Sequence, residues 1–161
     1  MLERLQKVPM CKGLTTDEAK QLASIAVEAS AKRGEKLFDE GAPGDSIIVV
    51  LEGKVDIVRS GQSLAQLGEG SVFGEMSLLG EGGKRTATAT VADDVKMLKI
   101  DAKKFQGLLA KNDLAALKVV TNLAQVMSKR LLAMNDKLIE STKGKKDGLG
   151  EFQKILNDWS F

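Results

Sequence analysis

Glycines interrupt residues 34–74 at short, fairly regular intervals, with brief runs of β-prone residues between them. Glycine adopts the positive φ angles of tight turns at little cost, so this spacing is typical of short strands joined by turns. The most apolar run covers residues 46–51, and Glu52-Gly53 separates it from a second run at residues 54–59. We therefore expect these two runs to pair as a hairpin.

The later part of this region continues the same pattern. Residues 86–91 and 95–100 are further strand-like runs, and Asp93-Asp94 lies between them as a turn signal. Many short strands with frequent turns are the signature of a sandwich or a barrel. The sequence thus predicts a mainly β region over residues 31–100.

Helical patterns flank the β region on both sides. Residues 1–30 are predicted to be helical, and Thr15 followed three positions later by Glu18 is a capping-box signature. Asp101 is a suitable N-cap for a return to helix, and a long amphipathic stretch covers residues 114–139. The expected architecture is therefore a barrel between two sets of helices.

The long amphipathic stretch carries an apolar seam that is too long for one small barrel to cover. Its members are Leu117, Val120, Leu123, Ala124, Met127, Leu131, Met134 and Leu138. A helix with such a seam is expected to pair with a copy of itself, which predicts a homodimer. The alternative is a helix that packs only on its own barrel.

The segment 73–89 combines a glycine, a carboxylate and an arginine. It begins Phe-Gly-Glu-Met-Ser-Leu-Leu, and after a glycine-rich loop it ends Arg-Thr-Ala-Thr-Ala. Gly74 lets the backbone approach a ligand, and the next residues can form a helical turn whose free N–H groups point at an anion. The guanidinium of Arg85 matches two phosphate oxygens, and Thr86 adds a hydroxyl beside it. The carboxylate of Glu75 can accept a hydrogen bond from a ribose hydroxyl.

This segment resembles the phosphate-binding cassette of cyclic nucleotide-binding domains, the family of the catabolite activator protein, the regulatory subunits of cAMP-dependent kinase and the gated ion channels. The resemblance covers residues 1–140 and implies the family's β-roll, a jelly-roll barrel with N-terminal helices and a long C-terminal helix. The implied phosphate contacts are Gly74, Met76, Arg85 and Thr86, and the implied ribose contacts are Gly74 and Glu75. The alternative is that Gly74 marks a turn, Glu75 is solvated and Arg85 is a surface charge.

The same resemblance implies contacts with the nucleobase. They fall on Leu64, Phe73, Arg130, Met134 and Asn135. Asn135 carries both a donor and an acceptor, so it can pair with adenine or guanine edges. Activator proteins usually place a Thr-Ser pair where this chain has Met134-Asn135, and a polar rim beside the helix seam is the alternative role of Arg130 and Asn135.

Residues 141–161 follow the long helix as a polar linker and a short amphipathic segment. The apolar face of this segment is expected to cover a patch of the barrel or the dimer. The alternative is a lid in which Trp159 or Phe152 stacks on the base, as aromatic caps do in some family members. Too few residues follow the long helix for the helix-turn-helix domain of the activators, so we expect a stand-alone module without direct DNA binding.

Composition narrows the function. The net charge of +2 gives no reason to expect a nucleic acid or an anionic membrane as partner. The chain has no histidine, the commonest general base and a frequent zinc and haem ligand, so we expect no enzyme activity, no metal and no haem. Asp93-Asp94 is the one tempting acidic pair, and a strand turn explains it better. No apolar run is long enough to span a bilayer and no secretory signal is present, which predicts a cytoplasmic location.

The resemblance to cyclic nucleotide-binding domains therefore implies a regulatory module that binds cAMP or cGMP. Binding is expected to change the position of the C-terminal helix and so to signal to an unidentified effector protein. The alternative is an interaction or scaffold module whose site is degenerate or takes a different anion. Thr86 is compatible with either nucleotide, so the sequence does not separate adenine from guanine.

Overall fold

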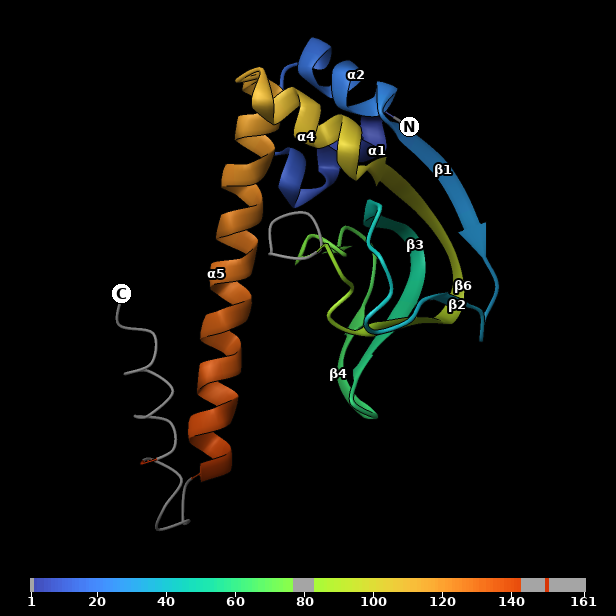
Figure 1. The fold of residues 1–161 in the computed structure, drawn as a ribbon, viewed down its shortest axis with the longest axis vertical. Coiled ribbons are helices and arrows are strands. Elements are labelled where there is room, and N and C mark those ends of the chain that lie inside the picture. Colours follow the sequence, from blue (N-terminus) through green and yellow to red (C-terminus); the bar gives the residue numbers. More distant parts are fainter. Residues whose placement is uncertain (1, 77–82, 143–149, 151–161) are drawn as a thin grey trace. The chain divides into compact units, whose positions relative to one another are not determined.

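The computed structural model describes residues 2–76, 83–142 and 150, and within them six strands form one antiparallel sheet (Figure 1). The helices are α1 Leu2–Lys7, η1 Pro9–Cys11 (a 3-10 helix), α2 Thr16–Ser24, α4 Ala102–Ala110 and α5 Leu114–Thr142. The strands are β1 Ala26–Ala31, β2 Lys36–Phe38, β3 Ser46–Arg59, β4 Gln62–Leu67, β5 Val72–Phe73 and β6 Thr88–Asp101. The sheet order is β1-β6-β3-β4, and β2 pairs with β6 while β5 pairs with β3.

Two long strands form the centre of the sheet, and they show that the predicted hairpins were wrong. β3 runs unbroken through Glu52-Gly53, and β6 runs unbroken through Asp93-Asp94. The two turn signals lie opposite each other, because Lys54 pairs with Asp93 and the register shifts on either side of that pair. Gly53 has a φ of 87°, and a Cβ at this position would overlap the backbone carbonyl of Asp94. These residues therefore form bulges that bend a strand pair, visible in Figure 1 as its curvature, instead of ending the strands.

The N-terminal helices end earlier than predicted. α2 begins with the expected capping box, in which Thr15 Oγ1 accepts from the N–H of Glu18 at 3.3 Å and the N–H of Thr15 donates to Glu18 Oε2 at 2.7 Å. The chain then becomes a strand at Ala26, which pairs with Ile100 of β6. The expectation of helix as far as residue 30 was wrong because pairing with β6 outweighs the helix propensity of the alanines in β1.

Buried apolar side chains, most of them from β3 and β6, form the core of the roll. The members of the main cluster are Ile48, Val50, Val55, Phe73, Ala89, Val91, Val95 and Met97. Phe38 of β2 packs against this cluster, and its ring centroid lies 5.9 Å from that of Phe73. The border of the core at Phe38 adjoins the candidate site described below.

The chain divides into two compact units, residues 1–122 and residues 123–161. The sheet, the N-terminal helices, α4 and the first part of α5 belong to the first unit, and the rest of α5 belongs to the second. No helix in the described part of the chain is both long and apolar enough to cross a membrane. Residues 143–149 and 151–161, on which the expected linker and lid fall, lie outside the described residues.

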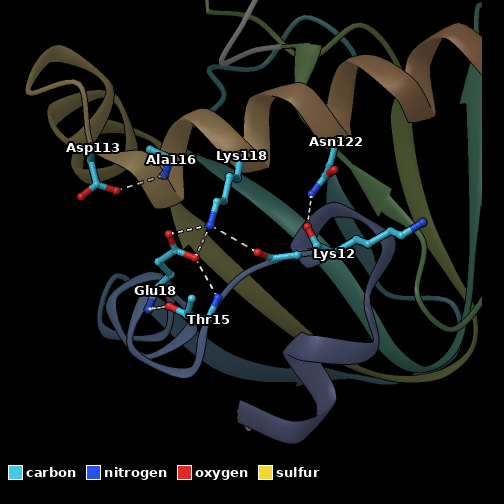
Figure 2. Close-up of polar contacts among 8 residues, drawn as sticks. Lys12, Thr15, Glu18, Asp113, Ala116, Lys118 and Asn122 are labelled. Carbon is cyan, nitrogen blue, oxygen red and sulfur yellow. Dashed lines mark hydrogen bonds and ion pairs between the residues drawn. The ribbon is translucent and has the colours of Figure 1, made fainter.

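The first turns of α5 are tied to the N-terminal segment by five polar side chains, which we call the α5 clasp: Glu18, Gln21, Asp113, Lys118 and Asn122. Figure 2 shows four of these residues, Glu18, Asp113, Lys118 and Asn122. Lys118 Nζ lies 2.8 Å from each carboxylate oxygen of Glu18, and Gln21 Nε2 donates to Asp113 Oδ2 at 2.8 Å. The α5 clasp thus joins segments about a hundred positions apart, as the separation of Glu18 and Lys118 shows.

Asn122 and Asp113 complete the α5 clasp through backbone groups. Asn122 Nδ2 donates to the carbonyls of Met10 and Lys12 at 3.0 and 2.8 Å. Asp113 Oδ1 accepts from the N–H of Ala116 at 3.0 Å, which caps the start of α5 (Figure 2). Both side chains satisfy backbone groups that would otherwise have to be hydrated.

Candidate functional site

The backbone of Arg85 is fixed by the turn that follows β2. Its N–H donates to the carbonyl of Ala42 at 2.8 Å, and its carbonyl accepts from the N–H of Gly41 at 2.8 Å. The N–H of Gly44 donates to the carbonyl of Gly83 at 2.7 Å. The segment that leads into β6 therefore runs alongside this turn, which sets the starting point of the Arg85 side chain.

The guanidinium of Arg85 lies inside the protein, with the residue only 5% exposed. Nη1 donates to the carbonyl of Ser46 at 2.8 Å and to that of Gly74 at 3.2 Å. Nη2 donates to Ser46 Oγ at 3.2 Å and to Asp45 Oδ1 at 3.3 Å. Cζ lies 4.2 Å from the centroid of the Phe38 ring. Arg85 is therefore not the surface charge that one interpretation of the sequence assumed.

Gly74 lies against this guanidinium with a φ of 80°. A Cβ at this position would overlap Arg85 Nη1 and would come within 3.1 Å of the carbonyl oxygen of Ser46. An L-residue would also be strained at this φ. The close approach that glycine permits here is thus to the arginine side chain as well as to any ligand.

Glu75 is also buried, with 6% of its surface exposed, so it is not a solvated turn residue. Burial lowers the pKa of Arg85, and the negative charges of Asp45 and Glu75 act in the opposite direction. The guanidinium keeps its charge, because arginine is not deprotonated in proteins. The structure therefore brings Gly74, Glu75 and Arg85 together, with both carboxylates near enough to act on the cation.

The other cassette residues lie nearer to solvent. Thr86 is exposed next to Arg85, and Met76, a helical residue, is 41% exposed. Residues 77–79, which were expected to continue the helical turn, lie outside the described residues. The anion-facing N–H groups of that turn stay a prediction.

The residues assigned to the base lie in three different surroundings. Leu64 is on β4 and is 51% exposed. Phe73 is on β5, where it is only 4% exposed and belongs to the core cluster, so it offers little surface to a base. Arg130, Met134 and Asn135 are on α5 within the second unit. Met134 is 63% exposed, and Arg130 and Asn135 are half-buried.

Sequence reasoning missed three residues that touch the guanidinium: Phe38, Asp45 and Ser46. Phe38 ends β2, Asp45 lies in the turn that follows, and Ser46 begins β3. The sequence indicated only strands and turns in this segment. Ser46 and Asp45 are 39 and 40 positions from Arg85, so no local spacing connects them. The signal that could have found them is chemical, because a buried guanidinium requires carbonyl, carboxylate or aromatic neighbours.

The geometry favours anion binding. A cationic fork of donors next to a glycine turn suits a phosphate, and a nearby carboxylate suits a hydroxyl of the same ligand. Within residues 2–76 and 83–142, no three or more His, Cys, Asp or Glu side chains gather as a metal site requires.

Comparison with known proteins gives the family. The family model described as "Cyclic nucleotide-binding domain" matches residues 28–112, which include all of the sheet except the first two residues of β1 and also the described part of the cassette. This chain belongs to the cyclic nucleotide-binding domain family. The fold predicted from the sequence, a β-roll with flanking helices and a long C-terminal helix, is confirmed.

Individual relatives of this cyclic nucleotide-binding domain differ in length. It is 34% identical over 128 residues to glutaminase 2 of Bradyrhizobium diazoefficiens, which covers 78% of this chain and 20% of that protein. It is also 34% identical over 128 residues to the cyclic AMP receptor protein of Thermus thermophilus, which covers 76% of this chain and 57% of that protein. The chain thus spans a fifth of the first relative and little more than half of the second.

A solved structure shows the same fold over almost the whole chain. The crystal structure of a cyclic nucleotide-binding domain from Methylobacillus flagellatus superposes with a TM-score of 0.77 at 27% sequence identity, covering 90% of this chain and 84% of that one. The cyclic nucleotide-binding domain is a regulatory fold, and the curated relatives named above are longer proteins of which this chain matches a part.

Proposed function

We propose that this chain binds cAMP or cGMP and acts as a regulatory module. The observation that carries the proposal is the buried guanidinium of Arg85. It donates to the carbonyl of Gly74, and the negative charge of Glu75 acts on it. The cyclic phosphate takes the donors of Arg85 and the hydroxyl of Thr86, and Glu75 accepts from the ribose 2′-hydroxyl. Met76 lies in the turn that completes the phosphate site.

Binding requires an exchange at the guanidinium, because its described contacts are with Ser46, Gly74 and Asp45. The contact with Asp45 is the easiest to replace. It is 3.3 Å long, and the Asp45 side chain is 91% exposed, so water screens this pair and can solvate the released carboxylate. A phosphate held in a drier position gives a stronger charge-assisted pair.

Thermal unfolding of the purified chain with and without each nucleotide tests the proposal. A ligand that binds only the folded state raises its stability, by about 2.7 kcal/mol at a hundredfold excess over the dissociation constant. We expect cAMP or cGMP, but not the corresponding linear 5′-monophosphate at the same concentration, to raise the melting temperature. No shift with either cyclic nucleotide at millimolar concentration would contradict the proposal.

Variants of the cassette locate the site. Arg85→Ala is expected to weaken binding at least tenfold by calorimetry, since it removes a charge-assisted pair of about 1.5–3 kcal/mol. Arg59→Ala is the matched control, because Arg59 is an exposed arginine of the same sheet. Glu75→Gln is expected to weaken binding less than Arg85→Ala, because an amide oxygen still accepts a hydrogen bond. Equal affinities of the Arg85 and Arg59 variants would remove Arg85 from the site.

The finer parts of the proposal concern the base and the output. The base contacts Leu64 and the α5 residues Arg130, Met134 and Asn135, and binding changes the position of α5. The exposed apolar residues of α5 support pairing with a second copy, which equilibrium sedimentation tests. An effector protein reads the bound state. The cytoplasmic location stays a prediction from the sequence.

One observation favours the second candidate function, an interaction or scaffold module. Carbonyl and side-chain oxygens of the protein already accept from both terminal nitrogens of Arg85, so the arginine could serve the fold alone. In that case Arg85→Ala lowers the melting temperature and neither nucleotide raises it. The unfolding experiment above therefore separates the two candidates.

A further inference from the structure

The segment 38–46, which we call the arginine cradle, surrounds Arg85 on several sides. Its turn holds the backbone of Arg85 through Gly41 and Ala42, and its end supplies the carbonyl and hydroxyl of Ser46 to the guanidinium. Its beginning supplies the ring of Phe38, 4.2 Å from the guanidinium carbon. The arginine cradle precedes the cassette in the sequence but contacts Arg85. Its side chains are therefore candidates for positioning groups of the anion site.

Phe38 is suited to this task because its own position is fixed. It pairs with Ala89 in the sheet, and its ring packs beside that of Phe73 in the core cluster at an interplanar angle of 41°. A ring held in this way offers a rigid face to the cation. The attraction between a guanidinium and an aromatic face increases when water is excluded, and Arg85 is almost completely buried.

Arg85 meets Phe38 and its hydrogen-bond acceptors through different atoms. Its Cζ lies over the Phe38 ring, whereas its hydrogen bonds to Ser46, Gly74 and Asp45 come from Nη1 and Nη2. These donors can therefore change from Ser46 and Asp45 to a phosphate while the contact with Phe38 persists. An arginine held against a fixed ring also loses less conformational freedom when the phosphate arrives, which favours binding.

We propose that Phe38 is a positioning residue of the anion site, whose ring holds the guanidinium of Arg85 while its donors exchange protein oxygens for a phosphate. The inference rests on the proposed function for the identity of the ligand. The contact between Phe38 and Arg85 does not depend on it, so a ligand-free measurement tests that part separately.

The binding experiment compares three variants by calorimetry with cAMP and with cGMP. Phe38→Leu keeps an apolar side chain but removes the aromatic face, and affinity is expected to fall about tenfold, as loss of a desolvated cation–π contact would give. Phe38→Tyr keeps the face and is expected to bind within about twofold of the unaltered chain. Phe105→Leu is the matched control, because Phe105 is a fully buried phenylalanine of α4 and has no assigned role in the anion site or the base contacts; its affinity is expected to change less than threefold.

The ligand-free experiment is a double-mutant cycle on unfolding by urea. Phe38→Leu is combined with Arg85→Met, which keeps a long apolar stem and removes the cation. The decrease in midpoint caused by Phe38→Leu is expected to be smaller in the Arg85→Met background than in the unaltered chain. The cycle of Phe105→Leu with Arg85→Met is expected to be additive.

These outcomes separate the failure of this inference from that of the proposed function. If neither nucleotide binds the unaltered chain, the proposed function fails, and the urea cycle still decides whether Phe38 holds Arg85. If a nucleotide binds and Phe38→Leu weakens binding no more than Phe105→Leu does, the inference is overturned. It is also overturned if Phe38→Tyr binds as weakly as Phe38→Leu, or if the Phe38–Arg85 cycle is additive.

Discussion

Arg85 and Lys118 each join segments that are far apart in the sequence, but they do so in opposite surroundings. The side chain of Arg85 is 3% exposed. It donates to two backbone carbonyls, to the hydroxyl of Ser46 and to the exposed carboxylate of Asp45, and it lies over the ring of Phe38. The side chain of Lys118 is 33% exposed, and both oxygens of the Glu18 carboxylate accept from it. One cation is held mainly by dipoles and the other by a full negative charge.

The difference shows which cation is available to a ligand. Lys118 is already neutralised by a carboxylate that also completes the capping box of α2, so it serves to connect α5 to the N-terminal segment. The described hydrogen bonds of Arg85 go mainly to carbonyl and hydroxyl oxygens, and a phosphate can take the place of the exposed Asp45 carboxylate. Substitutions near Arg85 should therefore alter binding at the proposed anion site, whereas substitutions in the α5 clasp should alter stability and leave binding unchanged.

The largest effect is expected from Gly74→Ala. The new Cβ overlaps Arg85 Nη1, and the positive φ adds roughly 1–2 kcal/mol of backbone strain. We expect affinity for the cyclic nucleotide to fall at least tenfold by calorimetry. Gly61→Ala is the matched control, because Gly61 has a φ of 76° and open space around it, so it isolates the strain from the overlap. Equal binding by the two variants would show that the approach of Gly74 to Arg85 is irrelevant to the ligand.

Asn122→Ala tests the α5 clasp without changing charge. It removes the donors to the carbonyls of Met10 and Lys12, and loss of these hydrogen bonds is expected to lower the free energy of unfolding by about 1–2 kcal/mol. Gln66→Ala, which removes one exposed side-chain hydrogen bond, is expected to change it much less. Urea titration measures both values. If Asn122→Ala weakened nucleotide binding as strongly as Gly74→Ala, the α5 clasp would affect binding as well as stability, which would contradict the distinction between the two regions.

Thr15→Ala is expected to have a smaller effect. It removes the side-chain acceptor for the N–H of Glu18, and loss of an N-cap typically costs about 1 kcal/mol. Thr15→Ser is expected to restore the stability because it keeps the hydroxyl. Thr121→Ala serves as control, since Thr121 lies inside α5 and its hydroxyl only donates back to the carbonyl of Leu117. A drop of the same size for Thr121→Ala would mean that Thr15 has no special role.

The smallest effect is expected from the charge pair itself, and it depends on pH. The hydrogen bond from Lys118 and then that from the N–H of Thr15 lower the pKa of Glu18. A lowered folded-state pKa contributes stability above the ordinary carboxylate value, about 4.3, and this contribution is lost as the pH falls through the folded-state value. The unfolding free energy of the unaltered chain should therefore fall more steeply below about pH 4 than that of Glu18→Gln.

Salt gives an independent check on the same pair. Added sodium chloride screens exposed charges, so the stability difference between the unaltered chain and Glu18→Gln should shrink at high ionic strength. Asp17→Asn, which removes an exposed pair with Lys20, is the matched control. Parallel pH curves for the unaltered chain and Glu18→Gln would show that the Glu18–Lys118 pair contributes nothing measurable.

The sequence predicted those parts of the fold that depend on local chemistry. The capping box at Thr15, the N-cap at Asp101 and the long amphipathic helix were all predicted from short-range spacing, and the structure contains them. The hairpin at Gly53 was predicted wrongly, because a glycine that bends a strand and one that ends it look the same until the pairing partner is known. Helix propensity misled at Ala26 for the same reason.

For the candidate site too, the sequence predicted the residues of one local motif and missed those that are distant in the sequence. Gly74, Glu75 and Arg85 lie close together in sequence, and the resemblance to a known motif identified them before the structure placed them side by side. Phe38 and Ser46 were missed, since their contact with Arg85 exists only after β2 and β3 have each paired with β6. Residues that shape a site across long separations require coordinates, whereas residues within one motif do not.

The long ladder between β3 and β6 determines which backbone amides are expected to exchange slowly. The ladder extends from Ser46 opposite Asp101 to Val58 opposite Thr88, so a single hydrogen-bonded ribbon runs from the segment before α4 to the start of β6. Amide protons in the mostly buried half of this ladder, residues 46–51 and 95–100, should exchange with deuterium only when the whole roll unfolds, whereas those of the exposed strand β4 should exchange through local fraying. Ser46, which accepts from Arg85, lies at the end of this slowly exchanging half, so a ligand at the proposed anion site can rearrange side chains there without loosening the backbone that holds them.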